Sequence, residues 1–165
     1  MKFLKFSSLA MSFLFCCGTA MADDLHRAQT RFGLADGSEN VLKINGHHTT
    51  PEVDGDGGMF VEKISETADA DYLLLTDVGG SVCPALYSIV KVAEHSVTPM
   101  AYFGNCNVDP KRTIVPGKSI TLAFEAYHPL RYKGAPMATY VYDIPTGVLK
   151  KNGRVVSTDC KGKCW

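Results

Sequence analysis

Cys83 is the residue whose type and setting could most directly carry out chemistry. It follows a Gly-Gly pair and precedes Pro84 in the stretch DVGGSVCPALYSIV, residues 77–90. A catalytic thiol needs a lowered pKa and a nearby base. Histidines occur elsewhere in the chain, at His47, His48, His95 and His128, but nothing in the sequence places one beside Cys83. We therefore interpret Cys83 as half of a disulfide and predict no catalytic residue.

The first 22 residues have the three zones of a secretory signal peptide. A short basic start is followed by an apolar stretch over residues 6–17 and by the small-x-small cleavage site Ala20-Met21-Ala22. The apolar zone is shorter than the roughly 20 residues that a membrane span needs. A lipoprotein signal is the alternative, but neither Cys16 nor Cys17 follows the small residue that such a signal requires. We expect cleavage after Ala22, export to the periplasm and no membrane span.

The length and charge of the exported chain limit its fold and partners. Of 165 residues, removal of 22 leaves 143, which suits one β-rich domain spanning 23–165. Two lysines are lost with the signal peptide, so 15 basic and 17 acidic residues remain and the net charge is −2. No basic run exceeds two residues. This pattern excludes nucleic acid as a partner, and we predict no cofactor.

The cysteines beyond the signal peptide are even in number, which in an exported chain indicates disulfides. They are Cys83, Cys106, Cys160 and Cys164. Three pairings are possible, and we favour Cys83–Cys106 and Cys160–Cys164. The first would close a loop of about 23 residues between two predicted strands and contribute roughly 3 kcal/mol. The second lies in DCKGKCW, where Gly162 lets the chain turn tightly.

Short segments rich in β-branched and aromatic residues, bounded by turn residues, indicate strands. They are YLLLTD (72–77), ALYSIVKVA (85–93), SITLAFEAY (119–127) and MATYVYDI (137–144). Two Asn-Gly pairs, at residues 45–46 and 152–153, are typical of tight hairpins. No window of a dozen residues has a sustained helical period. The sequence therefore predicts an all-β fold, an antiparallel β-sandwich-like single domain with two disulfides.

Two segments could bind a metal, but each has a simpler interpretation. In DGDGG the spacing from Asp54 does not match an EF-hand loop, because Met59 and Ser65 occupy the positions that require Gly and Glu. A looser calcium site at Asp54 and Asp56 stays open beside a flexible polar loop. Adjacent strand residues such as His47 and His48 point to opposite faces and cannot easily share one ion. We therefore predict no metal site.

The segment AYHPLRYKGAP (126–136) combines aromatic and basic side chains, a composition favoured at protein interfaces. The expected partner-binding residues are Tyr127, Arg131, Tyr132 and Lys133. The alternative is that these rings only pack on the sheet and cover its ends.

Several elements together resemble a group of small exported bacterial proteins of unassigned function. They are the Leu-rich strand, Gly-Gly, Cys-Pro-Ala-Leu-Tyr at 83–87, Phe-Gly-x-Cys at 103–106 and the closing Asn-Gly hairpin. The resemblance covers roughly residues 41–156 and implies a shared disulfide between Cys83 and Cys106. It carries over no catalytic residue.

These features predict an exported, non-enzymatic binding protein whose partner is another protein. The favoured subtype is an inhibitor or immunity protein against a hydrolase or toxin that reaches the envelope, because a rigid scaffold loses less entropy on binding. The first alternative is a periplasmic small-molecule or metal carrier, with His47, His48, Asp54 and Asp56 near its site. The second is an envelope enzyme that uses Cys83 and a histidine.

Overall fold

The computed structural model describes residues 24–129 and 133–164. The predicted signal peptide and two of the expected partner-binding residues, Arg131 and Tyr132, lie outside the described residues. The described chain forms strands in three antiparallel sheets, with one short parallel pair and no helix. The all-β, antiparallel, sandwich-like fold predicted from the sequence is confirmed.

Each sheet is built from consecutive strands. The N-terminal sheet contains β1 (Arg27–Thr30), β2 (Gly33–Asp36), β3 (Lys43–Ile44) and β4 (His47–His48). The central sheet contains β6 (Met59–Glu66), β7 (Ala70–Val78), β8 (Ala85–Ala93) and β9 (Ser96–Pro99). The C-terminal sheet contains β10 (Lys111–Val115), β11 (Ser119–Phe124), β12 (Ala138–Asp143), β13 (Val148–Lys151) and β14 (Arg154–Val155). The parallel pair joins β5 (Glu52–Val53) to β15 (Lys163–Cys164).

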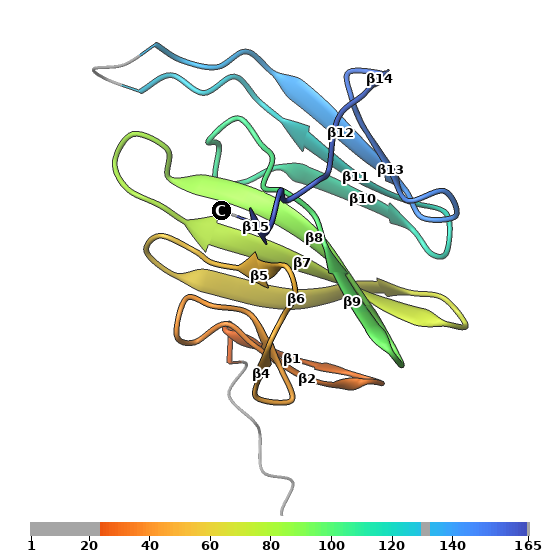
Figure 1. The fold of residues 1–165 in the computed structure, drawn as a ribbon. Coiled ribbons are helices and arrows are strands. Elements are labelled where there is room, and N and C mark those ends of the chain that lie inside the picture. Colours follow the sequence, from red (N-terminus) through yellow and green to blue (C-terminus); the bar gives the residue numbers. More distant parts are fainter. Residues whose placement is uncertain (1–23, 130–132, 165) are drawn as a thin grey trace, which may run out of the picture.

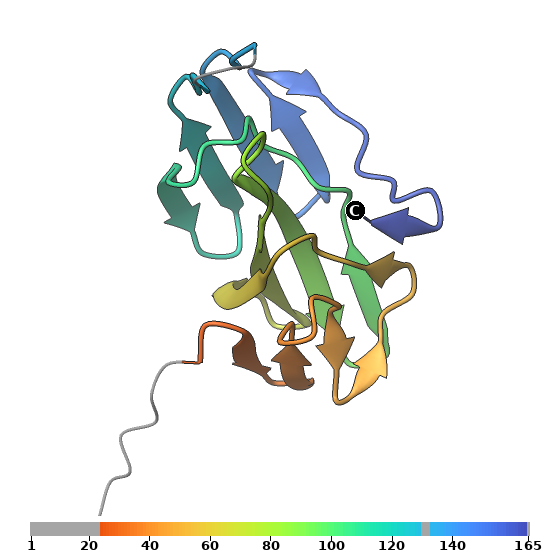
Figure 2. The same ribbon diagram turned by 90° about the vertical axis from the view of Figure 1, so that its left-hand side faces the viewer.

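The central sheet lies between the other two, so the molecule has three layers (Figure 1, Figure 2). Tyr72 and Leu74 on one face of β7 belong to the core shared with the C-terminal sheet. Leu73 and Leu75 on the other face belong to a second core, shared with the N-terminal sheet and with Cys164 of β15. Burial of both faces explains why β7 has a continuous apolar run rather than the alternation of a half-exposed strand.

Both Asn-Gly pairs form the predicted hairpin turns. Asn45-Gly46 joins β3 to β4, and Asn152-Gly153 joins β13 to β14. All four residues have positive φ, between 49° and 81°. A type I′ turn requires this conformation at both central positions, and Asn and Gly adopt it at the lowest cost.

The predicted disulfides are present, Cys83–Cys106 and Cys160–Cys164. The first ties the loop before β8 to the loop before β10, and the second closes the turn that leads into β15. Disulfides are typical of an oxidising compartment outside the cytoplasm. Within residues 24–129 and 133–164 no helix has the length and apolar character of a membrane span.

A buried ion pair anchors the N-terminal sheet to the central one. The carboxylate of Asp71 in β7 is fully buried and accepts hydrogen bonds from the Arg31 backbone N–H (2.7 Å) and the Arg31 Nε (2.8 Å). The Arg31 guanidinium also donates to the carbonyls of Thr67 and Ala70, and Lys63 Nζ lies 3.1 Å from Asp71. The β1–β2 turn is therefore held against the β6–β7 turn by charged hydrogen bonds.

Candidate functional site

A groove of about 720 Å³ lies on the side of the sandwich where β6 and β10 are at the edges of their sheets. In Figure 2 strand β6 lies between the N-terminal strands below it and β10 and β11 above it. The groove is lined by residues from five segments: Asp24, Leu25, Arg27, Ala28 and Gln29; Phe60, Val61, Glu62 and Lys63; Leu74, Thr76 and Val78; Pro84 and Ala85; Val108 and Arg112. A volume of this size is within the range of ligand-binding clefts.

The groove exists because the C-terminal sheet does not cover the whole central sheet. Along β6 the side chains alternate, and Met59 and Val61 enter the core beneath the N-terminal sheet. Phe60 and Glu62 point to the opposite face, toward the C-terminal sheet, but remain exposed. Strand β10, at the edge of its sheet, is exposed at all five positions. This face of β6, with Phe60 and Glu62, is therefore open to solvent.

Apolar side chains form much of the lining. Leu25 and Val108 are 62% and 60% exposed, and Phe60, which also lines the groove, is 37% exposed. His26 places its ring 5.3 Å from that of Phe60, and its Nδ1 lies 2.8 Å from the Met59 carbonyl oxygen. Apolar residues this exposed, gathered in one concavity, are typical of an interaction site.

Ion pairs surround the apolar lining. Arg112 of β10 pairs with Glu62 of β6 and so bridges the two sheets across the groove. Arg27 donates to Asp36 (2.9 Å) and lies 3.4 Å from Asp24. Burial of Asp36 would raise its pKa, but hydrogen bonds from Ser38 and from Arg27 outweigh burial and lower the pKa to about 2. The rim is therefore charged and largely paired at neutral pH.

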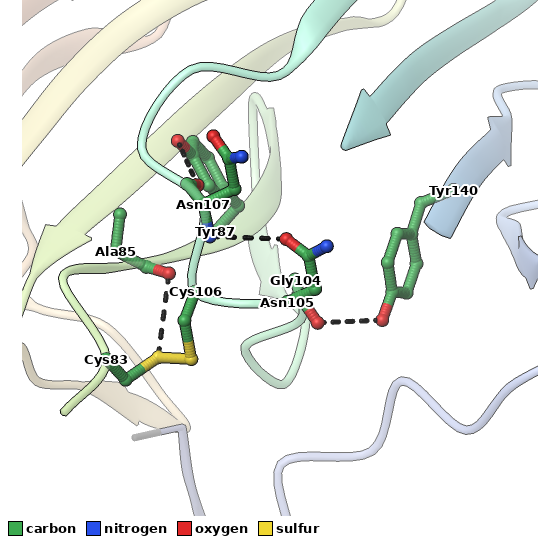
Figure 3. Close-up of a disulfide and its surroundings, with 8 residues drawn as sticks. All are labelled: Cys83, Ala85, Tyr87, Gly104, Asn105, Cys106, Asn107 and Tyr140. Atoms are coloured by element: carbon green, nitrogen blue, oxygen red, sulfur yellow. Dashed lines mark hydrogen bonds between the residues drawn. A yellow bond between two sulfur atoms is a disulfide. The ribbon is translucent and has the colours of Figure 1, made fainter. Parts of the chain in front are cut away.

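The Cys83–Cys106 disulfide fixes one end of the groove. Cys83 precedes two lining residues, Pro84 and Ala85, and Cys106 lies two residues before Val108. Figure 3 shows the disulfide beside the loop that contains Gly104, Asn105 and Asn107.

Hydrogen bonds hold that loop on both neighbouring sheets. Tyr140 donates to the Gly104 carbonyl (3.0 Å), and Tyr87 donates to the Asn107 carbonyl (3.3 Å) (Figure 3). The buried Asn105 side chain donates to the carbonyls of Glu125 (2.7 Å) and Pro136 (3.0 Å). The wall that presents Val108 is therefore preorganised.

The aromatic-basic segment expected to bind a partner lies elsewhere, between β11 and β12. Tyr127 and Ala135 exchange two backbone hydrogen bonds of 2.9 Å, so these two residues are antiparallel neighbours. Tyr127 is half-buried and Lys133 is exposed. Neither residue lines the groove. The partner-binding role of this segment stays a prediction.

The residues considered for a metal carrier do not lie in the groove either. His47 and His48 form β4, where His48 Nδ1 lies 2.9 Å from Glu52. With His95 they line a smaller pocket of about 320 Å³. Asp56 donates its backbone N–H to Asp77. Within the described residues, no group of three or more His, Cys, Asp or Glu side chains is arranged to hold a metal ion.

Asp77 is a buried carboxyl, 6% exposed, whose backbone partner is the Asp56 N–H at 2.8 Å. Burial raises the pKa of Asp77, and the nearby Asp56 charge raises it further. The folded chain thus holds this proton more tightly than the unfolded chain. The contribution of Asp77 to stability is therefore lost as the pH rises above the unfolded value of 3.8.

We expect Asp77→Asn to raise the free energy of unfolding at pH 7 and to give no gain at pH 3, since the amide keeps an acceptor without a buried charge. Urea unfolding at both pH values measures this. Asp159→Asn, at an exposed position, is the matched control and should change neither value. A destabilised Asp77→Asn at pH 7 would contradict the role assigned to burial.

Sequence reasoning missed the lining residues of the groove. Leu25, Phe60 and Val108 are single apolar residues in polar surroundings and carry no motif. The alternation in MFVE, residues 59–62, is a signal that could have been read as a strand with one apolar side chain on its second face. Whether that face is covered depends on the position of β10, about 50 residues later. Comparison of the chain with family models, curated proteins and solved structures found no match.

Proposed function

We propose that this protein is an exported, non-enzymatic binding protein of the periplasm that acts through its surface on another protein. The favoured subtype is an inhibitor or immunity protein that blocks a hydrolase or toxin reaching the envelope. The two disulfides support a location outside the cytoplasm.

The observation that carries the proposal is the groove. Its lining combines exposed apolar side chains with charged side chains, a composition found at protein-recognition surfaces. Its wall at Val108 is held by the Cys83–Cys106 disulfide and by the Asn105 side chain. A preordered surface loses less conformational entropy on binding, and that favours a tight inhibitor.

The volume of the groove favours a second candidate, a small-molecule carrier, because about 720 Å³ would accommodate an apolar ligand. Such a carrier would use the groove rather than His47, His48, Asp54 and Asp56. Native mass spectrometry of the protein purified from its host distinguishes the two, since a carrier retains a ligand of defined mass.

The test of the binding function is affinity capture followed by an activity assay. The oxidised mature protein is immobilised, exposed to envelope and secreted extracts, and any stoichiometric partner is identified. The proposal expects the captured protein to lose its hydrolytic or toxic activity when this protein is added. A partner whose activity is unaffected, or the absence of any partner, would contradict the inhibitor assignment.

Two variants locate the surface that binds. Phe60→Ser combined with Val108→Ser removes two exposed apolar side chains of the groove, and we expect it to weaken partner binding about tenfold. Arg131→Ala combined with Tyr132→Ala tests the aromatic-basic segment in the same assay. If only the Arg131→Ala, Tyr132→Ala variant loses binding, the binding site lies in the segment 126–136 rather than in the groove.

A further inference from the structure

The groove lies beside a free sheet edge. Among the described strands, β10 pairs only with β11, so its second side has no neighbouring strand. Alternate residues of an edge strand direct backbone N–H and C=O groups away from the sheet. All five residues of β10 are exposed. The edge can therefore accept another strand.

The side chains of β10 divide between two faces. Arg112 and Ile114 are registered with Leu122 and Ile120, which are buried in the core between the sheets. Arg112 and Ile114 thus face the open side of the sandwich, where Arg112 lines the groove. Lys111 is registered with Ala123 and faces outward. A strand added to β10 would send alternate side chains into the groove and out beside Lys111.

The charges at this edge indicate what kind of strand fits. Strand β10 carries two basic residues, Lys111 and Arg112, and no acidic one. Arg112 pairs with Glu62, and Arg27 and Lys63 in the groove also pair with carboxylates, so among the described residues Lys111 is the basic side chain of this edge without an ion-pair partner. A second copy of this chain would bring two basic strands side by side, and charged edge residues are a common device against such pairing. A strand with acidic side chains is attracted instead.

We propose that β10 and the groove together bind an extended protein segment whose apolar and acidic side chains alternate, by addition of that segment to the C-terminal sheet. The inference rests on the proposed binding function and specifies its mode. Backbone hydrogen bonds to β10 provide affinity. Apolar side chains of the segment lie against Phe60, Ile114 and Val108, and its carboxylates lie beside Lys111.

The test uses synthetic peptides of about seven residues, long enough to span β10. One alternates Val and Glu, a second has the same composition with the Val and Glu residues in separate blocks, and a third alternates Val and Lys. A fourth is the Val-Glu peptide with N-methyl groups on consecutive central amides, which removes N–H donors from both of its edges. Isothermal calorimetry measures affinity, and amide hydrogen exchange measures protection of residues 111–115.

The expected result is binding of the alternating Val-Glu peptide with new protection in β10, and at least about tenfold weaker binding of the other three. Lys111→Glu should weaken Val-Glu binding about tenfold, because it reverses a charge beside the added strand. Lys150→Glu, with the same charge change on exposed β13, is the control and should have little effect.

Equal binding of the N-methylated peptide would overturn strand addition, because that peptide lacks donors for the ladder. Equal binding of the blocked peptide would overturn the proposed alternation of apolar and acidic side chains. No binding of the Val-Glu peptide would overturn strand addition as well. A partner from the capture experiment that still binds the Lys111→Glu variant would leave the binding function standing while it contradicts this mode. Binding of the Val-Glu peptide without any captured partner would support strand addition but contradict the proposed binding function.

Discussion

Asp71→Ala is expected to lower the free energy of unfolding by about 1.5–3 kcal/mol, the range for lost hydrogen bonds to a charged group. Asp71 is fully buried and accepts hydrogen bonds from the backbone and side chain of Arg31. Its removal leaves these donors and Lys63 without their carboxylate. Most domains are stable by only about 5–15 kcal/mol, so the loss is a large share of the total. Chemical denaturation monitored by tyrosine fluorescence measures it.

Two further variants show whether the loss of stability comes from the ion pair of Asp71 or from any substitution in this region. Asp69→Ala, two residues earlier at an exposed position, should cost much less, because its partners are solvent-accessible. Asp71→Asn keeps an acceptor for the Arg31 backbone and should lose less than Asp71→Ala. If Asp69→Ala and Asp71→Ala lower the free energy of unfolding equally, the ion pair of Asp71 with Arg31 does not contribute specially to stability.

The same ion pair makes stability depend on pH in a defined direction. Burial alone would raise the pKa of Asp71, but hydrogen bonds from Arg31 and Lys63 outweigh burial, and the pKa is lowered from 3.8. A lowered carboxyl pKa contributes stability above the unfolded value, and this contribution is lost as the pH falls below it. The difference between the native chain and Asp71→Asn should therefore shrink below about pH 3.8.

Removal of the Cys83–Cys106 disulfide, as the double substitution to Ser, is expected to cost roughly 3 kcal/mol. The chain-entropy relation gives this value for a separation of 23 residues. The same substitution at Cys160 and Cys164, separated by four residues, should cost less, roughly 2 kcal/mol. Calorimetric melting of both double variants shows which disulfide contributes more to stability.

The first disulfide should also matter for binding. Without Cys83–Cys106, the loop that presents Val108 retains only its hydrogen bonds, and part of the groove wall must be ordered during binding. Partner affinity should fall in this variant and stay unchanged when Cys160 and Cys164 are replaced, since these residues do not line the groove. If partner affinity is unchanged in both variants, the Cys83–Cys106 disulfide does not order the binding site.

Local signals were sufficient for the strands and turns that the sequence predicted. The segment 85–93 is a strand with the bounds expected from its composition, and both Asn-Gly pairs turn as their conformational preference requires. The disulfide pairing followed from spacing and from predicted strand ends. The expected strand over 119–127 ends at Phe124, because the chain leaves the sheet before Tyr127, which pairs with Ala135 instead.

Non-local features could not be predicted. The N-terminal sheet is made of strands of two to four residues such as Arg27–Thr30, too short to give a periodic signal. The fixed position of its first turn comes from Arg31 contacting Asp71, 40 residues away. The groove likewise forms because, among the described strands, none covers Phe60. The identity of a residue does not show whether a distant strand will cover it.

The parallel pair of β5 and β15 has a consequence for the order in which the protein can fold. Residues 52–53 are synthesised long before residues 163–164, yet the two segments are neighbours in the folded structure. Cys164 is 1% exposed and completes the core beneath the N-terminal sheet. That core therefore stays incomplete until residues 163–164 have been synthesised. Contacts of such high sequence separation form late, so the apolar residues of this core remain exposed until β15 pairs with β5.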